Sequence, residues 1–142
     1  MIPLVSAEQM RALDNQTIEN LGIAGGVLME TAGRGVVEVL WRLHREGALD
    51  LFAGQVVVVA GPGNNGGDGM VVARYLHSSG VTVKLLLCAE RARVKGDALR
   101  HLQAAEELGV LISEHSGDSR VTVVVEHLTQ LSKRDIVVDA LL

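Results

Sequence analysis

Aromatic residues and long apolar runs are scarce in this chain. Aromatic side chains make up 2% of the 142 residues, whereas hydrophobic residues make up 48%, so the core must be built from Val, Leu, Ile, Ala and Met. A chain of this length forms one domain that buries about two-thirds of the surface exposed by its unfolded form. We therefore expect a single domain of aliphatic helices and strands.

Cysteine and clustered positive charge are equally sparse. Cys88 is the single cysteine, which excludes an internal disulfide and a cysteine-cluster metal site. The formal net charge is −4 and the few aromatic residues are scattered, so nucleic acid is not expected as a partner. The N-terminus lacks a signal-peptide pattern, and no apolar run approaches the roughly 20 residues that cross a bilayer. These absences predict a soluble cytoplasmic protein with no membrane partner.

Hydrophobic periodicity predicts alternating helices and strands. The segment 119–135 is ambiguous, because its valines favour a strand while the spacing of Val124, Leu128 and Leu131 favours a helix, which we prefer. The fold class predicted is α/β, a three-layer αβα Rossmann-like open sheet, mostly parallel, with helices on both faces. The expected helices span about 6–21, 24–47, 69–80, 95–108 and 119–135, and the expected strands span 55–60, 81–88, 110–112 and, as a further buried strand, 135–142.

The most informative stretch is "VVVVAGPGNNGGDGMVVARYL" (Val56 to Leu76), in which a valine strand leads into a glycine-rich turn. In a parallel sheet such a turn lies at the crevice beyond the carboxyl ends of the strands, where helix N-termini bind anions. Its glycines permit positive φ and close approach of the backbone to a ligand. Asn64, Asn65 and Asp68 add oxygen atoms that can hold a cation. A Gly-x-Gly-x-x-Gly spacing matches a dinucleotide fingerprint, but the Walker-type Lys-Ser/Thr pair is absent.

Three segments together resemble the NAD(P)H-hydrate epimerase family, also called the YjeF N-terminal domain. They are "MRALDNQTIENLGIAGGVLMETAGRG", the glycine-rich stretch above and "DIVVDALL", and they follow one another in the family's order along nearly the whole chain. "GPGNNGGDG" is the most specific of the matches. Ala24 and Thr31 depart from the Pro and the Asn or Arg that are more frequent in the family, and these departures leave the glycine-rich turn intact.

The resemblance implies an isomerase that interconverts the S and R epimers of hydrated NADH or NADPH. A stereospecific NAD(P)H-hydrate dehydratase, fused or separate, could then repair both epimers. A homodimer is compatible with the resemblance. It further implies that Asn65 and Asp139 help to coordinate a potassium ion, and that the nucleotide-hydrate site is lined by Asn64, Asn65, Gly66, Gly67 and Asp68.

The epimerisation chemistry requires an acid near the hydrated carbon. Protonation of the hydroxyl lets the lone pair of the ring nitrogen expel water, which leaves an iminium-like cation that water can attack from the other face. We assign the acid role to Asp139, at the end of its strand, with a strand-end cap or a pure ion ligand as the alternatives. Asp68 is the second choice for the acid, with helix capping as its alternative role.

Two other functions stay open at this point. One is a non-catalytic nucleotide-binding or protein-interaction module, and the other is an ordinary NAD-dependent dehydrogenase domain, in which Glu90 would bind a ribose although Arg91 lies beside it. Family members continue past "DALL" into another glycine-rich loop and further site residues. We therefore expect residues 1–142 to form one domain that lacks its C-terminal part, and we expect no epimerase turnover from these residues alone.

Overall fold

The computed structural model describes residues 4–117 and 120–141. Helices and strands alternate after two leading helices, and the ambiguous segment is helical over 120–129, although the helix ends before the expected 135 and residue 119 lies outside the described residues. In chain order the elements are α1 (Ala7–Glu19), α2 (Gly25–Arg45), β1 (Val56–Ala60), α3 (Asn64–Ser78), β2 (Val83–Leu87), the 3-10 turn η1 (Arg91–Arg93), α4 (Gly96–Glu107), β3 (Leu111–Glu114), α5 (Arg120–Thr129) and β4 (Ile136–Ala140).

The four strands form one parallel sheet in the order β3-β2-β1-β4. All five residues of β1 are buried, as a continuous valine run in a doubly covered strand requires. The chain moves from β1 through β2 to β3 in one direction and then returns to the other side of β1 for β4, so the strand order reverses between β1 and β4. This arrangement confirms the predicted α/β fold class.

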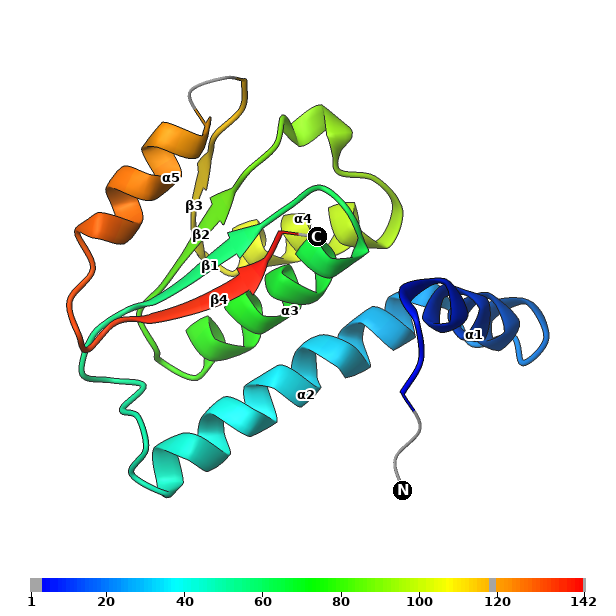
Figure 1. Cartoon of the computed structure of the whole chain (residues 1–142), viewed down its shortest axis with the longest axis horizontal. Coiled ribbons are helices and arrows are strands. Elements are labelled where there is room, and N and C mark those ends of the chain that lie inside the picture. Colours follow the sequence, from blue (N-terminus) through cyan, green and yellow to red (C-terminus); the bar gives the residue numbers. More distant parts are fainter. Residues whose placement is uncertain (1–3, 118–119, 142) are drawn as a thin grey trace.

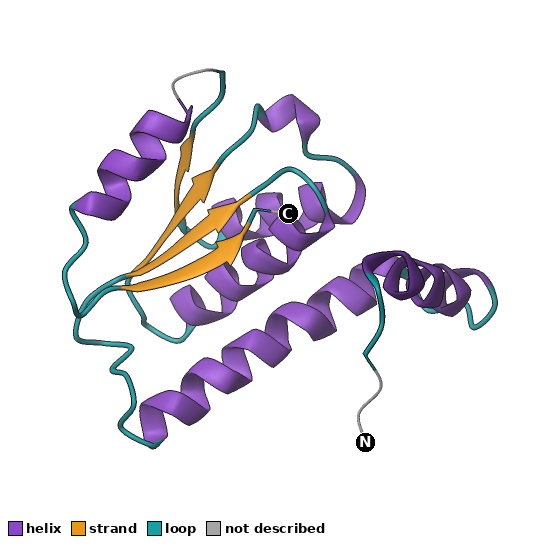
Figure 2. Ribbon diagram, in the orientation of Figure 1, coloured by secondary structure: helices purple, strands orange, loops and turns teal. Residues whose placement is uncertain are grey.

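Helices cover both faces of the sheet (Figure 1). Helix α5 covers one face, where Val124, Leu128 and Leu131 pack against Val57 and Val59 of β1 and against β2. Helices α3 and α4 cover the other face, and the colouring by secondary structure shows the sheet between these helix layers (Figure 2). Helix α2 lies outside α3, and α1 lies beyond the N-terminal end of α2.

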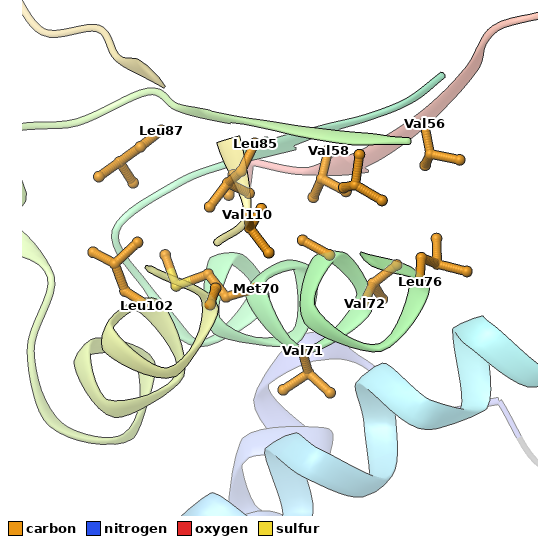
Figure 3. Packing of buried hydrophobic residues seen from close by; sticks show 14 of the residues in the cluster. Val56, Val58, Met70, Val71, Val72, Leu76, Leu85, Leu87, Leu102 and Val110 are labelled. Atoms are coloured by element: carbon orange, nitrogen blue, oxygen red, sulfur yellow. The ribbon is translucent and has the colours of Figure 1, made fainter. Parts of the chain in front are cut away.

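The main core lies between the sheet and α3, and its buried residues are aliphatic side chains and methionines (Figure 3). Met70 and Leu76 of α3 and Val56, Val58 and Leu85 of the sheet are completely buried. Among the described residues no polar or charged residue is buried. The prediction of a core without aromatic residues is therefore confirmed, and burial of apolar area is the main stabilising contribution in this part of the molecule.

Helix α2 packs closely on α3 because a glycine stands at the crossing. A Cβ atom on Gly33 would lie 2.5 Å from Cβ of Val71, so no larger residue fits without a shift of the helices. Beside this crossing, Glu30 accepts hydrogen bonds from the guanidinium of Arg74 and, at 2.5 Å, from the hydroxyl of Tyr75. These contacts fix the position of α2 over the middle and the C-terminal half of α3.

The first helix and the last strand differ in how well they match the sequence expectations. The capping box at Ser6 and Gln9 is present at the start of α1. The expected last strand is present as β4, but the expectation that it is buried is wrong, because β4 pairs only with β1 among the described strands and only Ala140 of its residues is buried. Val137, which pairs with Val57 on the α5 side of the sheet, is 45% exposed. None of the helices in the described residues is long and apolar enough to cross a membrane.

Candidate functional site

The glycine-rich turn is shorter than the sequence predicts. Helix α3 begins at Asn64, with Gly63 as its N-cap, so the turn proper consists of Gly61, Pro62 and Gly63. The expectation that the helix begins near Gly69 is wrong. Intrinsic propensity disfavours glycine within a helix, but here the glycines are placed where neighbouring elements leave no room for a side chain.

Close packing, and not positive φ, explains four of these glycines, namely Gly61, Gly66, Gly67 and Gly69, whereas a Cβ atom on Gly63 would have nothing within 4 Å. None of the glycines from Gly61 to Gly69 has a positive φ, so that expectation is wrong. The close approaches that the structure shows are to protein atoms, and the expected approach of this backbone to a ligand stays a prediction. A Cβ atom on Gly66 would overlap the carbonyl oxygen of Gly61, and one on Gly69 would lie 2.6 Å from Cβ of Ala140. The first turns of α3 therefore rest on the carboxyl ends of β1 and β4.

The carboxyl ends of β1 and β4 lie side by side at one edge of the sheet, where a backbone hydrogen bond joins them. The N–H of Gly61 donates to the carbonyl of Ala140 at 2.9 Å. Asp139 pairs in register with Val59, which belongs to the face of the sheet that α5 covers. Its side chain is exposed, and Oδ1 accepts a hydrogen bond from the N–H of Leu141 at 3.1 Å. Asp139 thus caps the end of its strand, at the carboxyl edge, through Oδ1.

Asn64 and Asp68 lie on the opposite side of the sheet. They are one helical turn apart on α3 and line a pocket of about 200 Å³ together with Asp14 of α1 and Asp97 of α4. Burial raises the pKa of the Asp68 carboxyl from 3.8 to about 6, and repulsion from the Asp14 carboxylate adds to the shift. A carboxyl group with such a pKa retains a protonated fraction near neutral pH and is suited to proton transfer.

The pocket also adjoins the N-terminus of α2, which Ala24 leaves without a side-chain cap. A Cβ atom on Gly25 would lie 2.8 Å from a carboxylate oxygen of Asp97. A carboxylate in this place complements the partial positive charge of a helix N-terminus. Asp14 and Asp97 were not among the residues predicted for the site, because nothing in the sequence indicates that α1 and α4 meet the first turn of α3.

The predicted site residues are therefore divided by the fold. Gly66 and Gly67 are buried and contribute backbone only. Asn65 is exposed and shares a helical face with Gly69, one turn later, which packs on β4. Helix geometry thus places Asn65 towards the end of β4, whereas Asn64 and Asp68 belong to the pocket between the helices.

A second crevice lies on the α5 side of the same edge, with a volume of about 420 Å³. The glycine-rich turn forms one of its walls and the valines of α5 form another. Arg93, which follows β2, was not predicted as a site residue. The described residues lining the crevice are Gly61, Pro62, Cys88, Arg93, Val121, Val124, Val125 and Leu141.

The donor set at the edge fits a hard monovalent cation better than a transition metal. Nowhere in the described part of the chain do three His, Cys, Asp or Glu side chains gather in a way that could hold a metal ion. The amide oxygen of Asn65 and the carboxylate of Asp139 are hard oxygen ligands, and this donor chemistry fits an ion such as potassium.

A parallel sheet with crevices beyond its carboxyl edge, next to the reversal of strand order, defines a Rossmann-like class of ligand-binding domain. Comparison with known families makes the assignment narrower. Residues 25–142 match the family described as YjeF-related protein N-terminus, and the chain belongs to this family.

Curated relatives extend the match to nearly the whole chain. The chain is 34% identical to an NAD(P)H-hydrate epimerase of Leuconostoc mesenteroides over 141 residues, which is 99% of the chain and 61% of that protein. It is 34% identical to an NAD(P)H-hydrate epimerase of Rhodopirellula baltica, covering 99% of the chain and 52% of the relative. It is 41% identical over 106 residues to the bifunctional NAD(P)H-hydrate repair enzyme Nnr of Salinibacter ruber, covering 75% of the chain and 19% of that enzyme.

A solved structure supports the same fold. The chain is similar to the crystal structure of the yeast protein ynu0, YNL200c, with a TM-score of 0.75 and 26% identity, over 99% of this chain and 57% of the yeast chain. The chain thus spans between about half and three-fifths of the length of the epimerases and of the yeast protein that it matches.

Proposed function

We propose that the protein epimerises the hydrated forms of NADH and NADPH. The observation that carries the proposal is the carboxyl edge of the sheet, where α3 begins against the end of β1 and where Asp139 stands near the end of β4. The relatives named as NAD(P)H-hydrate epimerases cover this edge. Asn64, Asn65, Gly66, Gly67 and Asp68 are proposed to bind the nucleotide hydrate.

Two carboxyl groups compete for the role of proton donor. Asp139 is our first choice, because it lies exposed near the end of β4 at the carboxyl edge. A carboxyl group there can protonate the hydroxyl of the hydrate and then, as a carboxylate, stabilise the cation that remains after water has left. Asp68 is the second choice, and its pKa of about 6 supports it. The two groups lie on opposite sides of the sheet, so one of them serves another purpose.

A potassium ion belongs to the same proposal. Asn65 and Asp139 would hold it through an amide oxygen and a carboxylate oxygen, and the ion would supply positive charge next to the bound nucleotide. A negatively charged ligand such as Asp139 would also be held in place by it. This role is compatible with proton transfer only if one carboxylate oxygen stays free for the substrate.

The proposed partner is an NAD(P)H-hydrate dehydratase, fused or separate. The name of the bifunctional repair enzyme of Salinibacter ruber supports a link between two activities in that protein. A cytoplasmic location and a homodimer are also proposed, without a role for either in the chemistry of the site.

The direct test starts from one pure epimer of hydrated NADH, at saturating potassium, with the natural gene product that carries these residues. Chromatography should show conversion into the other epimer at a rate well above the spontaneous one, and no net formation of NADH. Tight binding of the hydrate without conversion would identify a binding module. Equal binding of NADH and its hydrate, with hydride transfer to a substrate, would identify a dehydrogenase.

A further inference from the structure

The crevice of about 420 Å³ between the glycine-rich turn and α5 has the size and the position of a small-molecule site. Its volume is within the range of about 300–1,000 Å³ that is typical of small-molecule sites. It lies beyond the carboxyl ends of the strands and beside the reversal of strand order between β1 and β4, where open α/β sheets bind their ligands. Gly61 and Pro62 form one wall, so the crevice adjoins the proposed catalytic edge.

The walls of this crevice are apolar on the α5 side. Val121 is 64% exposed and Val125 is 50% exposed, although α5 packs on the sheet through its other residues. Together with Leu141 they give the crevice exposed branched apolar side chains, on which a planar ring can bury apolar surface.

Arg93 is the one charged side chain among the described residues that line the crevice. It is exposed and forms no ion pair with any residue that the structure describes. Arg91, two residues earlier, is half-buried and forms an ion pair with Glu106. Its guanidinium forms two hydrogen bonds with the carboxylate of Glu106, and its N–H donates to Glu114 at 3.0 Å.

We propose that this crevice holds one half of a dinucleotide, with a planar ring on the α5 valines and the guanidinium of Arg93 paired with a phosphate. The ligand class rests on the proposed function. A guanidinium matches two phosphate oxygens in a bidentate arrangement. The residue is exposed to solvent, so its removal should weaken phosphate binding by about tenfold and not by several orders of magnitude.

Two phosphates could fulfil this role, namely the pyrophosphate of either nucleotide or the 2′-phosphate of the NADP form. The test measures the binding of NADP⁺, NAD⁺, ADP and adenosine to the natural gene product by calorimetry. Arg93→Gln should weaken the binding of NADP⁺ about tenfold and leave that of adenosine unchanged, and Arg93→Lys should restore part of the loss. An equal loss for NAD⁺ and ADP assigns Arg93 to the pyrophosphate, and a loss confined to NADP⁺ assigns it to the 2′-phosphate.

Arg91→Gln is the matched control, because it removes an identical charge two residues away that is already paired with Glu106. It should bind all four ligands as the unaltered protein does. Unchanged binding of NADP⁺ after Arg93→Gln, or the absence of nucleotide binding by the unaltered protein, would overturn the proposal. If the unaltered protein epimerises the hydrate but Arg93→Gln leaves NADP⁺ binding unchanged, this inference alone is refuted. If NADP⁺ binding depends on Arg93 but the unaltered protein does not epimerise the hydrate, the proposed function alone is refuted.

Discussion

Gly66 lies directly against the carbonyl oxygen of Gly61, which a Cβ atom at position 66 would overlap. The first turn of α3 therefore sits on the chain as it leaves β1, and the backbone of this turn is held next to the ends of β1 and β4. The contact requires glycine for reasons of space alone, since φ at this position is not positive.

Gly66→Ala should destabilise the protein by roughly 2–3 kcal/mol, because the clash is with backbone and can be relieved only by moving α3. Gly35→Ala is the matched control. Gly35 is also within a helix, but nothing lies within 4 Å of its added Cβ, so alanine should stabilise the protein by about 1 kcal/mol through helix propensity. Urea unfolding measures both changes. Equal stability of the two variants would show that α3 does not rest on Gly61.

Gly67→Ala should cost less than Gly66→Ala. The added Cβ would overlap Sδ of Met29, which stands near the end of a flexible side chain that can change rotamer. The same urea series gives the ranking, and a larger loss for Gly67→Ala would mean that Met29 is held rigidly between α2 and α3.

Asp68→Asn should raise the stability of the protein above pH 6. The folded pKa of about 6 exceeds the ordinary value of 3.8, so the folded state holds a proton that the unfolded state has lost between these values. Stability therefore falls as the pH rises from about 4 to 6, and ionised Asp68 weakens the fold at higher pH. Thermal unfolding at pH 7.5 should show a higher midpoint for Asp68→Asn.

The difference should disappear below about pH 4, where Asp68 is protonated in both states. Glu107→Gln removes an exposed carboxylate of α4 and serves as the control for overall charge. A stability gain for Asp68→Asn that does not change with pH would refute the assignment of the cost to ionisation.

Asn65→Ala should raise the potassium concentration required for half-maximal epimerisation by about tenfold, because one oxygen ligand is lost. Asn64→Ala is the control. Asn64 lies in the pocket with Asp68, so its removal should affect hydrate binding without changing the potassium dependence. An identical potassium dependence in Asn65→Ala and the unaltered protein would exclude Asn65 as a ligand.

The sequence predicts the helix and sheet layers of this fold well. It does not predict that the site residues lie in two separate places, the pocket between the helices and the carboxyl edge of the sheet. Valine runs identify β1 and β4 as strands, but the same run is compatible with a central or an edge position, which depends on the neighbours of the strand. The sequence places the start of this helix near Gly69 because "GPGNNGGDG" has low helix propensity. In the structure α3 begins at Asn64, because packing against β1, β4 and α2 overrides that propensity.

The position of the helix start decides which side chains meet. A helix that begins at Asn64 puts Asn64 and Asp68 on one face, towards α1, and puts Asn65 on another, towards β4. A helix that begins near Gly69 would have left Asp68 in a turn. The pocket with Asp14 and the crevice with Arg93 both depend on tertiary contacts that no local pattern contains.

The central claim is that catalysis occurs at the ends of β1 and β4, with Asp139 as the proton donor. The most direct test is the rate of epimerisation by Asp139→Asn in the natural gene product at saturating potassium, with binding of the hydrate followed separately. The account predicts a fall in turnover of roughly 10²–10⁴-fold with a much smaller loss of binding. A rate within a few-fold of that of the unaltered protein, together with a large loss in Asp68→Asn, would contradict it and move the proton transfer to the pocket between the helices.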